Sequence, residues 1–592
     1  MLNVDICSTS NGRTELLITS YRCSGRIAQA AYIEGLHANC NPWQGSQSER
    51  RNFDILMSYF NIHFAITALV SIAFWRFLVR RKSKRLLSNI SGPPSPSWFK
   101  GNYQQVFNPD AWGFHEFLAE KYGSMSRLHG PYGTNTLYTF DPKAMQSVLV
   151  KDQDVFEEED GFIKGNLLIF GEGLLGTLGH QHRKQRKMLN PVFSAAHMRE
   201  MIPVFFEVTH KLESALKNRL QAGPSTQEVE ILSWMGRTAL ELIGQAGLGY
   251  SFDPLTDEES AHPYSQVIKE LFPTLIRLQF WQFNVLPYVS WIGTAGFRRR
   301  IVKMLPWKDL HHVQDMIDYM YGVSEEIYKM KINALNAGDE AVALQIGRGN
   351  DLISVLMKEN MKASKEDRLR DVEVIDQSGM ARILHLLSQH PEAQQKLRQE
   401  LIEAKHLKDG HDFSYEDLTT LPYLDAVCRE TLRLYTPVTT VTRRARRDAI
   451  IPLLRPIIGM DGTEVHEVAA PNDTTVVVSI FNSNRNPDLW GEDAGEWKPE
   501  RWLSPLPKAL LEARIPGVYS HLMTFLGGGR SCIGFKFSQL EMKVVISTLV
   551  EKFQFSPSSN DSEIFWQMNG VTAPVIGKDN HPQLPIRISL VN

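Results

Sequence analysis

A single cysteine, Cys532, lies in the glycine-rich stretch FLGGGRSCIGFKF near the C-terminus, with Arg530 two positions before it. Two common uses of such a loop do not fit its residues. A nucleophile elbow has the pattern G-x-S-x-G, but Ile533 stands where the second glycine belongs. A phosphate-binding loop has a lysine after its second glycine, but Phe535 follows Gly534. The remaining chemistry is that of a thiolate that binds a metal.

The residues around Cys532 favour this use of the thiol. A helical pattern, FKFSQLEMKVVISTLVEKF, begins just after it, and both a helix N-terminus and the charge of Arg530 stabilise a thiolate. Glycines also let the backbone approach a flat cofactor closely. The alternative is a buried, inert cysteine, which is a common role of the residue.

The stretch resembles the haem-binding loop of the cytochrome P450 family, F-x-x-G-x-R-x-C-x-G. The fixed positions of that loop are present as Phe525, Gly528, Arg530, Cys532 and Gly534. The resemblance implies haem b with Cys532 as the axial iron ligand, whose electron donation favours O–O cleavage.

A second motif resembles the E-x-x-R pair of that family. Glu430 and Arg433 lie three positions apart on one helix face. As an isolated surface pair they would contribute only about 0.2–0.5 kcal/mol. In the family, an arginine such as Arg501 of WKPERW completes a buried network with this pair behind the haem. Such a network compensates charges that are costly to bury, so the resemblance implies a folding element.

Haem propionates are carboxylates and need cations or donors. The stretch HRKQRKMLNPVF resembles the family's W-x-x-x-R helix, with His182 in the place of the tryptophan and Arg186 matching the arginine. Arg443 falls where the family has a further propionate arginine, although its neighbour Arg444 is an alternative. For each of these residues the competing interpretation is a charge that faces water.

The resemblance breaks down at the family's longest helix, which carries an A/G-G-x-D/E-T signature and delivers protons to oxygen. Here the matching stretch reads DVEVIDQSGMARILHLLSQHPEAQQKL, and Ser378 to His385 include no threonine, aspartate or glutamate. Neither Ser378 nor His385 is placed over the iron by its spacing, so no catalytic residue is assigned. Either the sequence lacks a segment, through a skipped exon or a wrong splice junction, or the chain is a variant that holds haem but couples oxygen poorly.

Composition narrows the class of protein around these motifs. The chain of 592 residues is 43% hydrophobic, which is typical of a globular protein. A net charge of -2 gives no field that would attract nucleic acid. No C-x-x-C pair occurs, so neither a zinc site nor a disulfide scaffold is expected. The cysteines are Cys7, Cys23, Cys40, Cys428 and Cys532.

A membrane anchor is expected at residues 53–79. The run Ile55–Trp75 has no charged residue and is about as long as a bilayer-spanning helix, near 20 residues. Basic residues crowd its C-terminal side between Arg76 and Arg85, which predicts a cytosolic body after the span. The alternative is a buried core helix. Residues 80–98 form a basic, proline-rich linker, and residues 1–52 form an N-terminal extension of unknown role.

Residues 99–592 are expected to form one body, mainly α with a minor β portion, as in the cytochrome P450 fold. Apolar residues recur every three or four positions over residues 205–220, 390–405 and 421–434, which predicts helices. The β-branched run Thr474–Phe481 predicts a strand.

The resemblance implies a monooxygenase of the endoplasmic reticulum membrane. The sequence is similar to fungal enzymes of secondary metabolism. Such an enzyme would insert one oxygen atom of O2 into a hydrophobic terpenoid, fatty acyl or aromatic molecule, with electrons from NADPH through NADPH-cytochrome P450 reductase. Lys536 is a candidate contact for that reductase, or an ordinary solvated lysine. Apolar pocket walls are expected at Gly165–Gly176 and at Asn569–Gly577.

Two other classes of function remain open. A non-catalytic haem-binding or scaffold protein of the same fold would keep the cysteine loop without turnover. A cysteine hydrolase would use Cys532 as a nucleophile, but no histidine has a motif that marks it as the required base.

Overall fold

The computed structural model describes residues 3–8, 14–19, 67, 86–256, 262–338, 351, 354, 373–577 and 581–591. The chain divides into two compact units, Met1–Arg80 and Arg81–Asn592. In the first unit, β1 (Asn3–Ser8) pairs antiparallel with β2 (Thr14–Thr19).

The predicted membrane span falls outside the described residues, apart from Thr67. Within the described part of the chain, every helix is too short or too polar to cross a membrane.

The larger unit is mainly helical, as expected. The principal helices are α3 (Trp112–Tyr122), α5 (Asp160–Phe170), α6 (Gly179–Leu189), α7 (Ala195–Gln221), α8 (Ile231–Leu242), α9 (Pro263–Asn284), α12 (Lys308–Ala337), α15 (Glu373–Gln389), α16 (Pro391–His406), α18 (Pro422–Leu434) and α22 (Phe535–Lys552). Shorter helices include α10 (Leu286–Val289), α11 (Ala295–Met304) and α17 (Tyr415–Thr420).

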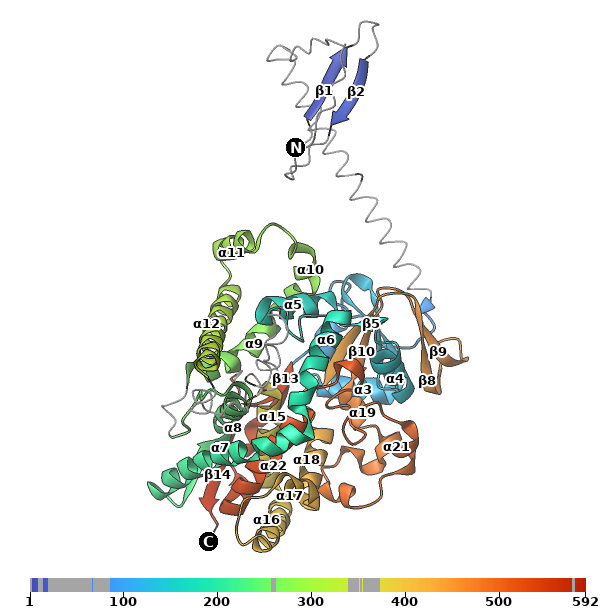
Figure 1. Ribbon diagram of the computed structural model, residues 1–592. Coiled ribbons are helices and arrows are strands. Elements are labelled where there is room, and N and C mark those ends of the chain that lie inside the picture. Colours follow the sequence, from blue (N-terminus) through green and yellow to red (C-terminus); the bar gives the residue numbers. More distant parts are fainter. Residues whose placement is uncertain are drawn as a thin grey trace. The chain divides into compact units, whose positions relative to one another are not determined.

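The strands form small sheets beside these helices (Figure 1). A five-stranded sheet has the order β3 (Met125–His129), β4 (Asn135–Thr139), β10 (Thr475–Ser479), β7 (Thr440–Ala445), β5 (Phe156–Glu157). A three-stranded sheet consists of β11 (Phe553–Pro557), β14 (Pro585–Leu590) and β6 (Thr226–Glu230). Two further pairs are β8 (Ala449–Ile458) with β9 (Glu464–Ala470), and β12 (Ile564–Asn569) with β13 (Val571–Ile576).

Local sequence explains the elements that carry the candidate site. The strand β10, TVVVS, is buried along its whole length, as expected for a β-branched run in the middle of a sheet. It pairs antiparallel with β7, so that Val476 lies opposite Arg443. The helix α18 begins at Pro422, a residue suited to the first helical position. The three helices and the strand predicted from the sequence are therefore confirmed.

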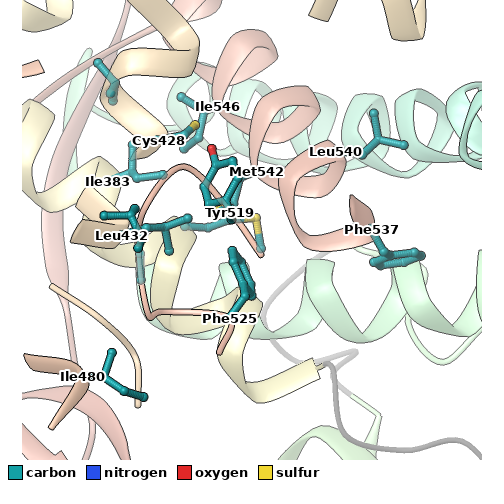
Figure 2. Close-up of a cluster of buried hydrophobic side chains, with 14 of the residues drawn as sticks. Ile383, Cys428, Leu432, Ile480, Tyr519, Phe525, Phe537, Leu540, Met542 and Ile546 are labelled. Atoms are coloured by element: carbon teal, nitrogen blue, oxygen red, sulfur yellow. The ribbon is translucent and has the colours of Figure 1, made fainter. Parts of the chain in front are cut away.

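The core helix α22 packs against α7, α15, α16 and α18. Its Met542 belongs to one apolar cluster with Ile383 of α15, Leu432 of α18 and Phe525 of the cysteine loop (Figure 2). Cys428 of α18 lies in the same cluster, where burial raises the pKa of its thiol to about 12. The core thus fixes the loop on a rigid base, and Cys428 is an inert thiol.

Candidate active site

The loop that carries Cys532 is held by its own backbone. The amide of Cys532 donates to the carbonyl oxygen of Phe525 at 2.9 Å, and the Phe525 ring is buried beneath the loop. Gly534 caps the N-terminus of α22, which begins at Phe535. Cys532 is half-buried and outside any disulfide. The thiol therefore lies next to a helix N-terminus, where a thiolate is stabilised.

Gly528 shows why the loop needs glycine. Its φ of 73° lies in the left-handed region, and a Cβ there would lie 2.1 Å from the carbonyl oxygen of Leu149. The next residue, Gly529, donates its amide to Gln153 Oε1 at 2.9 Å. The loop is thus docked on the segment that precedes β5.

Arg186 of α6 holds the same loop from the other side. Its Nη1 donates to the carbonyl oxygen of Ser531 at 2.6 Å, and its Nη2 donates to Ser531 Oγ at 2.9 Å. Burial lowers the pKa of this guanidinium, while the charge of Cys532 opposes that shift. The charges of Arg186 and Cys532 therefore interact, and Arg186 binds Ser531, the residue directly before Cys532.

Glu158 lies between two arginines of the predicted site. Its Oε1 accepts from Arg530 Nε at 2.6 Å, and Arg443 Nη2 lies 3.2 Å from the same oxygen. Burial favours the protonated acid, but Arg443 and Arg530 outweigh burial and lower the pKa of Glu158. The carboxylate is therefore ionised. Glu158 was not predicted from the sequence, although it lies in the acidic run EEED at positions 157–160.

His182 is buried beside this group. Burial first, and then the charge of Arg530, lower the pKa of its imidazole to about 4, against the opposing influence of Glu158. The ring is therefore neutral near pH 7 and can donate one N–H hydrogen bond. His182, Arg186, Arg443 and Arg530 thus gather at one place, whereas Arg444 pairs with Glu159 and Asp473.

The residues present fit a flat, dianionic cofactor. Among the described residues, the buried Nη2 of Arg530 has no hydrogen-bond partner, which leaves a donor for an added carboxylate. Arg443 and Arg530 face the carboxylate of Glu158, and Arg186 adds a third guanidinium beside Arg530, so the group has an excess of positive charge. Haem, with its two propionates and its iron open to a thiolate, satisfies these features.

The predicted charge network forms around Glu430. Arg433 donates to both carboxylate oxygens of Glu430 at 2.8 Å, and both side chains are fully buried. Arg501 Nε lies 3.4 Å from Glu430 Oε1, and Trp502 donates to Oε2 at 2.9 Å. Further bonds from Arg433 reach the carbonyl oxygens of Asn484 and Ala494. The network joins α18 to the segment that precedes the cysteine loop.

The distal helix α15 has 17 residues, and its polar groups serve the fold. Ser378 Oγ donates to the carbonyl oxygen of Thr572 at 2.6 Å. His385 Nδ1 accepts from Trp566 at 3.1 Å, and its Nε2 lies 3.1 Å from Asp561 Oδ1. Burial, and then the charge of Arg382, lower the pKa of His385 to about 4. Ser378 is therefore hydrogen-bonded to β13, and His385 to Trp566 of β12 and to Asp561.

A family model described as Cytochrome P450 matches residues 91–575 of the chain. The chain belongs to the cytochrome P450 family. The family binds haem and holds its iron with a cysteine thiolate, and its members act as monooxygenases.

The curated relatives agree with this assignment and cover most of the chain. Cytochrome P450 monooxygenase 91 of Postia placenta is 48% identical over 529 residues, which cover 87% of this chain and 96% of the relative. Cytochrome P450 monooxygenase 212 of the same fungus is 46% identical over 540 residues, covering 88% and 98%. A ganoderic acid synthetase of Ganoderma lucidum is 43% identical over 533 residues, covering 87% and 96%.

Proposed function

We propose that this cytochrome P450 uses Cys532 as its iron ligand and oxygenates a hydrophobic small molecule. The observation that carries the proposal is the convergence of the cysteine loop with Arg186, Arg443 and Arg530 on one site. In this arrangement Cys532 would hold the iron, while the arginines and the neutral His182 would hold the propionates. Bound haem supplies the activation of O2 and the transfer of one oxygen atom to the substrate.

The ligand assignment is tested by the absorbance of the reduced, carbon monoxide-bound chain. We expect the spectrum of a thiolate-ligated haem in the wild-type chain and its complete loss in Cys532→Ala. Cys428→Ala is the matched control, because Cys428 is a fully buried thiol of α18 and not part of the loop. A thiolate spectrum that survives Cys532→Ala would refute the assignment.

The electrons would come from NADPH through NADPH-cytochrome P450 reductase. Exposed basic residues of α6 support a docking face for an acidic partner, since they lie on the helix that holds the cysteine loop. These are Arg183, Lys184 and Lys187. Replacing Lys184 and Lys187 by glutamate should slow NADPH-dependent reduction at low salt, while dithionite should reduce the haem normally. An unchanged rate would exclude this face.

The substrate proposal rests on the apolar segments expected to form the pocket walls and on a relative named ganoderic acid synthetase, which supports a biosynthetic role. The candidates are terpenoid, fatty acyl and aromatic molecules. Incubation with each class, NADPH and reductase should yield a product heavier by one oxygen atom. Products formed equally without NADPH would argue against monooxygenation.

We further propose that residues 53–79 anchor the chain in the endoplasmic reticulum membrane with the body in the cytosol. An apolar surface on α10, α11 and the segment between them supports contact with lipid, since Trp291 is 77% exposed and Met304 is 83% exposed. Arg300 and Lys303 add positive charge to α11. The full chain should stay in alkali-washed membranes, and Ala68→Arg with Ile72→Arg should release it. Release of the wild-type chain would refute the anchor.

A second candidate, a haem-loaded chain that couples oxygen poorly, is favoured by the distal helix. Ser378 and His385 are occupied by Thr572, Asp561 and Trp566, and no acid or threonine follows Ser378 in α15. Sequencing the transcript across Asp371 to Leu387 separates the two candidates. An additional segment with an acid and a threonine would indicate an ordinary enzyme, whereas the message as written would indicate the poorly coupled form.

A further inference from the structure

Glu158 is an acidic residue inside the site proposed to bind the haem propionates. A carboxylate is unexpected there, because it competes with the propionates for the same arginines. The carboxylate of Glu158 is buried and accepts from Arg530 Nε at 2.6 Å, with Arg443 Nη2 at 3.2 Å. Its negative charge also acts to raise the pKa of His182, against the larger lowering by burial. Glu158 thus faces three of the four side chains that the proposed function assigns to the propionates.

The neighbouring acids show that this position is distinct. Glu157 pairs with Arg446 at 3.2 Å, and Asp160 pairs with the same arginine at 2.9 Å. Glu159 pairs with Arg444 at 3.3 Å. Strand pairing brings Glu158 near Arg443, because β5 runs antiparallel to β7 with Glu157 opposite Arg444. Of the run EEED, only Glu158 reaches Arg443 and Arg530.

The charges of the group are balanced for haem. Arg186, Arg443 and Arg530 carry three positive charges, Glu158 carries one negative charge, and His182 is neutral near pH 7. The net charge of the group is therefore two positive charges. Ferric iron, the porphyrin ring and one thiolate cancel in charge, so the two propionates carry the net charge of the cofactor. The site and the ferric cofactor neutralise one another only because Glu158 is ionised.

We propose that Glu158 is a positioning residue that shares Arg443 and Arg530 with the haem propionates and holds down the reduction potential of the iron. In the haem-free chain its carboxylate orders the two guanidinium groups that a propionate later engages. In the haem-loaded chain its negative charge disfavours the extra electron of the ferrous state, because charges in a buried site are screened weakly.

The test is Glu158→Gln in the full haem-loaded chain, because glutamine keeps an acceptor for Arg530 and removes only the charge. The proposal rests on haem ligation by Cys532, so the reduced, carbon monoxide-bound spectrum is recorded first for every variant. Loss of the thiolate spectrum in the wild-type chain would refute the proposed function, independently of Glu158.

Spectroelectrochemical titration then gives the potential. We expect Glu158→Gln to raise the equilibrium constant for reduction about three- to tenfold, the upper limit being about 59 mV for one electron. Transfer of haem to excess apomyoglobin should become slower by about threefold, since the arginines no longer share their charge with a competing carboxylate.

Two further variants complete the test. The wild-type potential should be retained by both. Glu157→Gln removes a charge that is paired with Arg446, and Glu158→Asp keeps the charge at position 158. A potential of Glu158→Gln at or below the wild-type value would overturn the proposal. So would a Glu158→Gln chain that fails to retain haem while Glu158→Asp retains it, because that result would make the carboxylate a purely structural element.

Discussion

The two sides of the proposed haem site differ in how their polar groups are used. On the side of the cysteine loop, Arg530 keeps a buried donor without a partner among the described residues, and the cluster of charges matches a dianionic cofactor. On the side of α15, Ser378 and His385 are bound to Thr572, Asp561 and Trp566. The polar groups on the side of the loop can bind a cofactor, whereas those on the side of α15 are used in hydrogen bonds within the fold.

This contrast separates two abilities that the family normally combines. Binding haem needs a thiolate and cations, which the sequence supplies from the loop, α6 and β7. Activating oxygen also needs a proton source above the iron. The chain as written has the first ability and lacks an assigned residue for the second.

The largest expected effect comes from breaking the buried network behind the loop. Glu430→Gln leaves Arg433 as an uncompensated buried cation and should lower the free energy of unfolding by roughly 3–5 kcal/mol. Urea unfolding measures this difference. Lys211→Gln is the control, because its pair with Glu207 on α7 is exposed and should contribute at most about 0.5 kcal/mol. Equal effects of the two changes would show that the network is dispensable.

The next effect concerns how tightly the side of the cysteine loop holds haem. Arg530→Gln removes a donor from the charge cluster and should speed the release of haem by about tenfold, which corresponds to about 1.4 kcal/mol. Transfer to apomyoglobin gives the rate. Arg455→Gln, which removes an exposed ion pair with Asp488, should leave the rate unchanged. A similar acceleration by both variants would show a general weakening of the fold.

A smaller effect is expected on the distal side. Ser378→Ala removes one buried hydrogen bond and should cost about 1 kcal/mol of unfolding free energy. It should leave the yield of hydrogen peroxide per NADPH unchanged, because the hydroxyl serves Thr572. Ser388→Ala on the same helix also removes one buried hydrogen bond, to the carbonyl oxygen of His385, and should have an effect of similar size on stability. A large rise in peroxide yield for Ser378→Ala alone would give Ser378 a part in proton delivery.

The last expected effect is a pH dependence of stability. The pKa of His385 is lowered to about 4, whereas an unfolded histidine has a pKa of about 6.5. Between these values the unfolded chain binds more protons, so the unfolding free energy falls as pH falls from about 6.5 towards 4. His385→Gln should make this decrease shallower, and exposed His406→Gln should not. An identical slope for His385→Gln and the wild-type chain would mean that His385 is already charged in the fold.

The sequence predicted more of the cofactor side than of the rest. Cys532, Arg530 and Glu430 are part of local motifs whose spacing is readable, and the β-branched run of β10 marks a buried strand. Glu158 was missed because its role depends on β5 meeting β7, a pairing between distant segments. His385 could not be excluded by spacing alone, since only packing against β12 shows that its ring is occupied.

The most direct test of the contrast is the fate of electrons in the full chain, loaded with haem and supplied with reductase, NADPH and a bound hydrophobic substrate. The ratio of hydrogen peroxide formed to NADPH consumed is measured together with oxygenated product. We expect a normal thiolate spectrum and some oxygenated product, with most electrons recovered as peroxide. Product formed in step with NADPH, and little peroxide, would contradict poor coupling, because a proton source would then operate on the distal side.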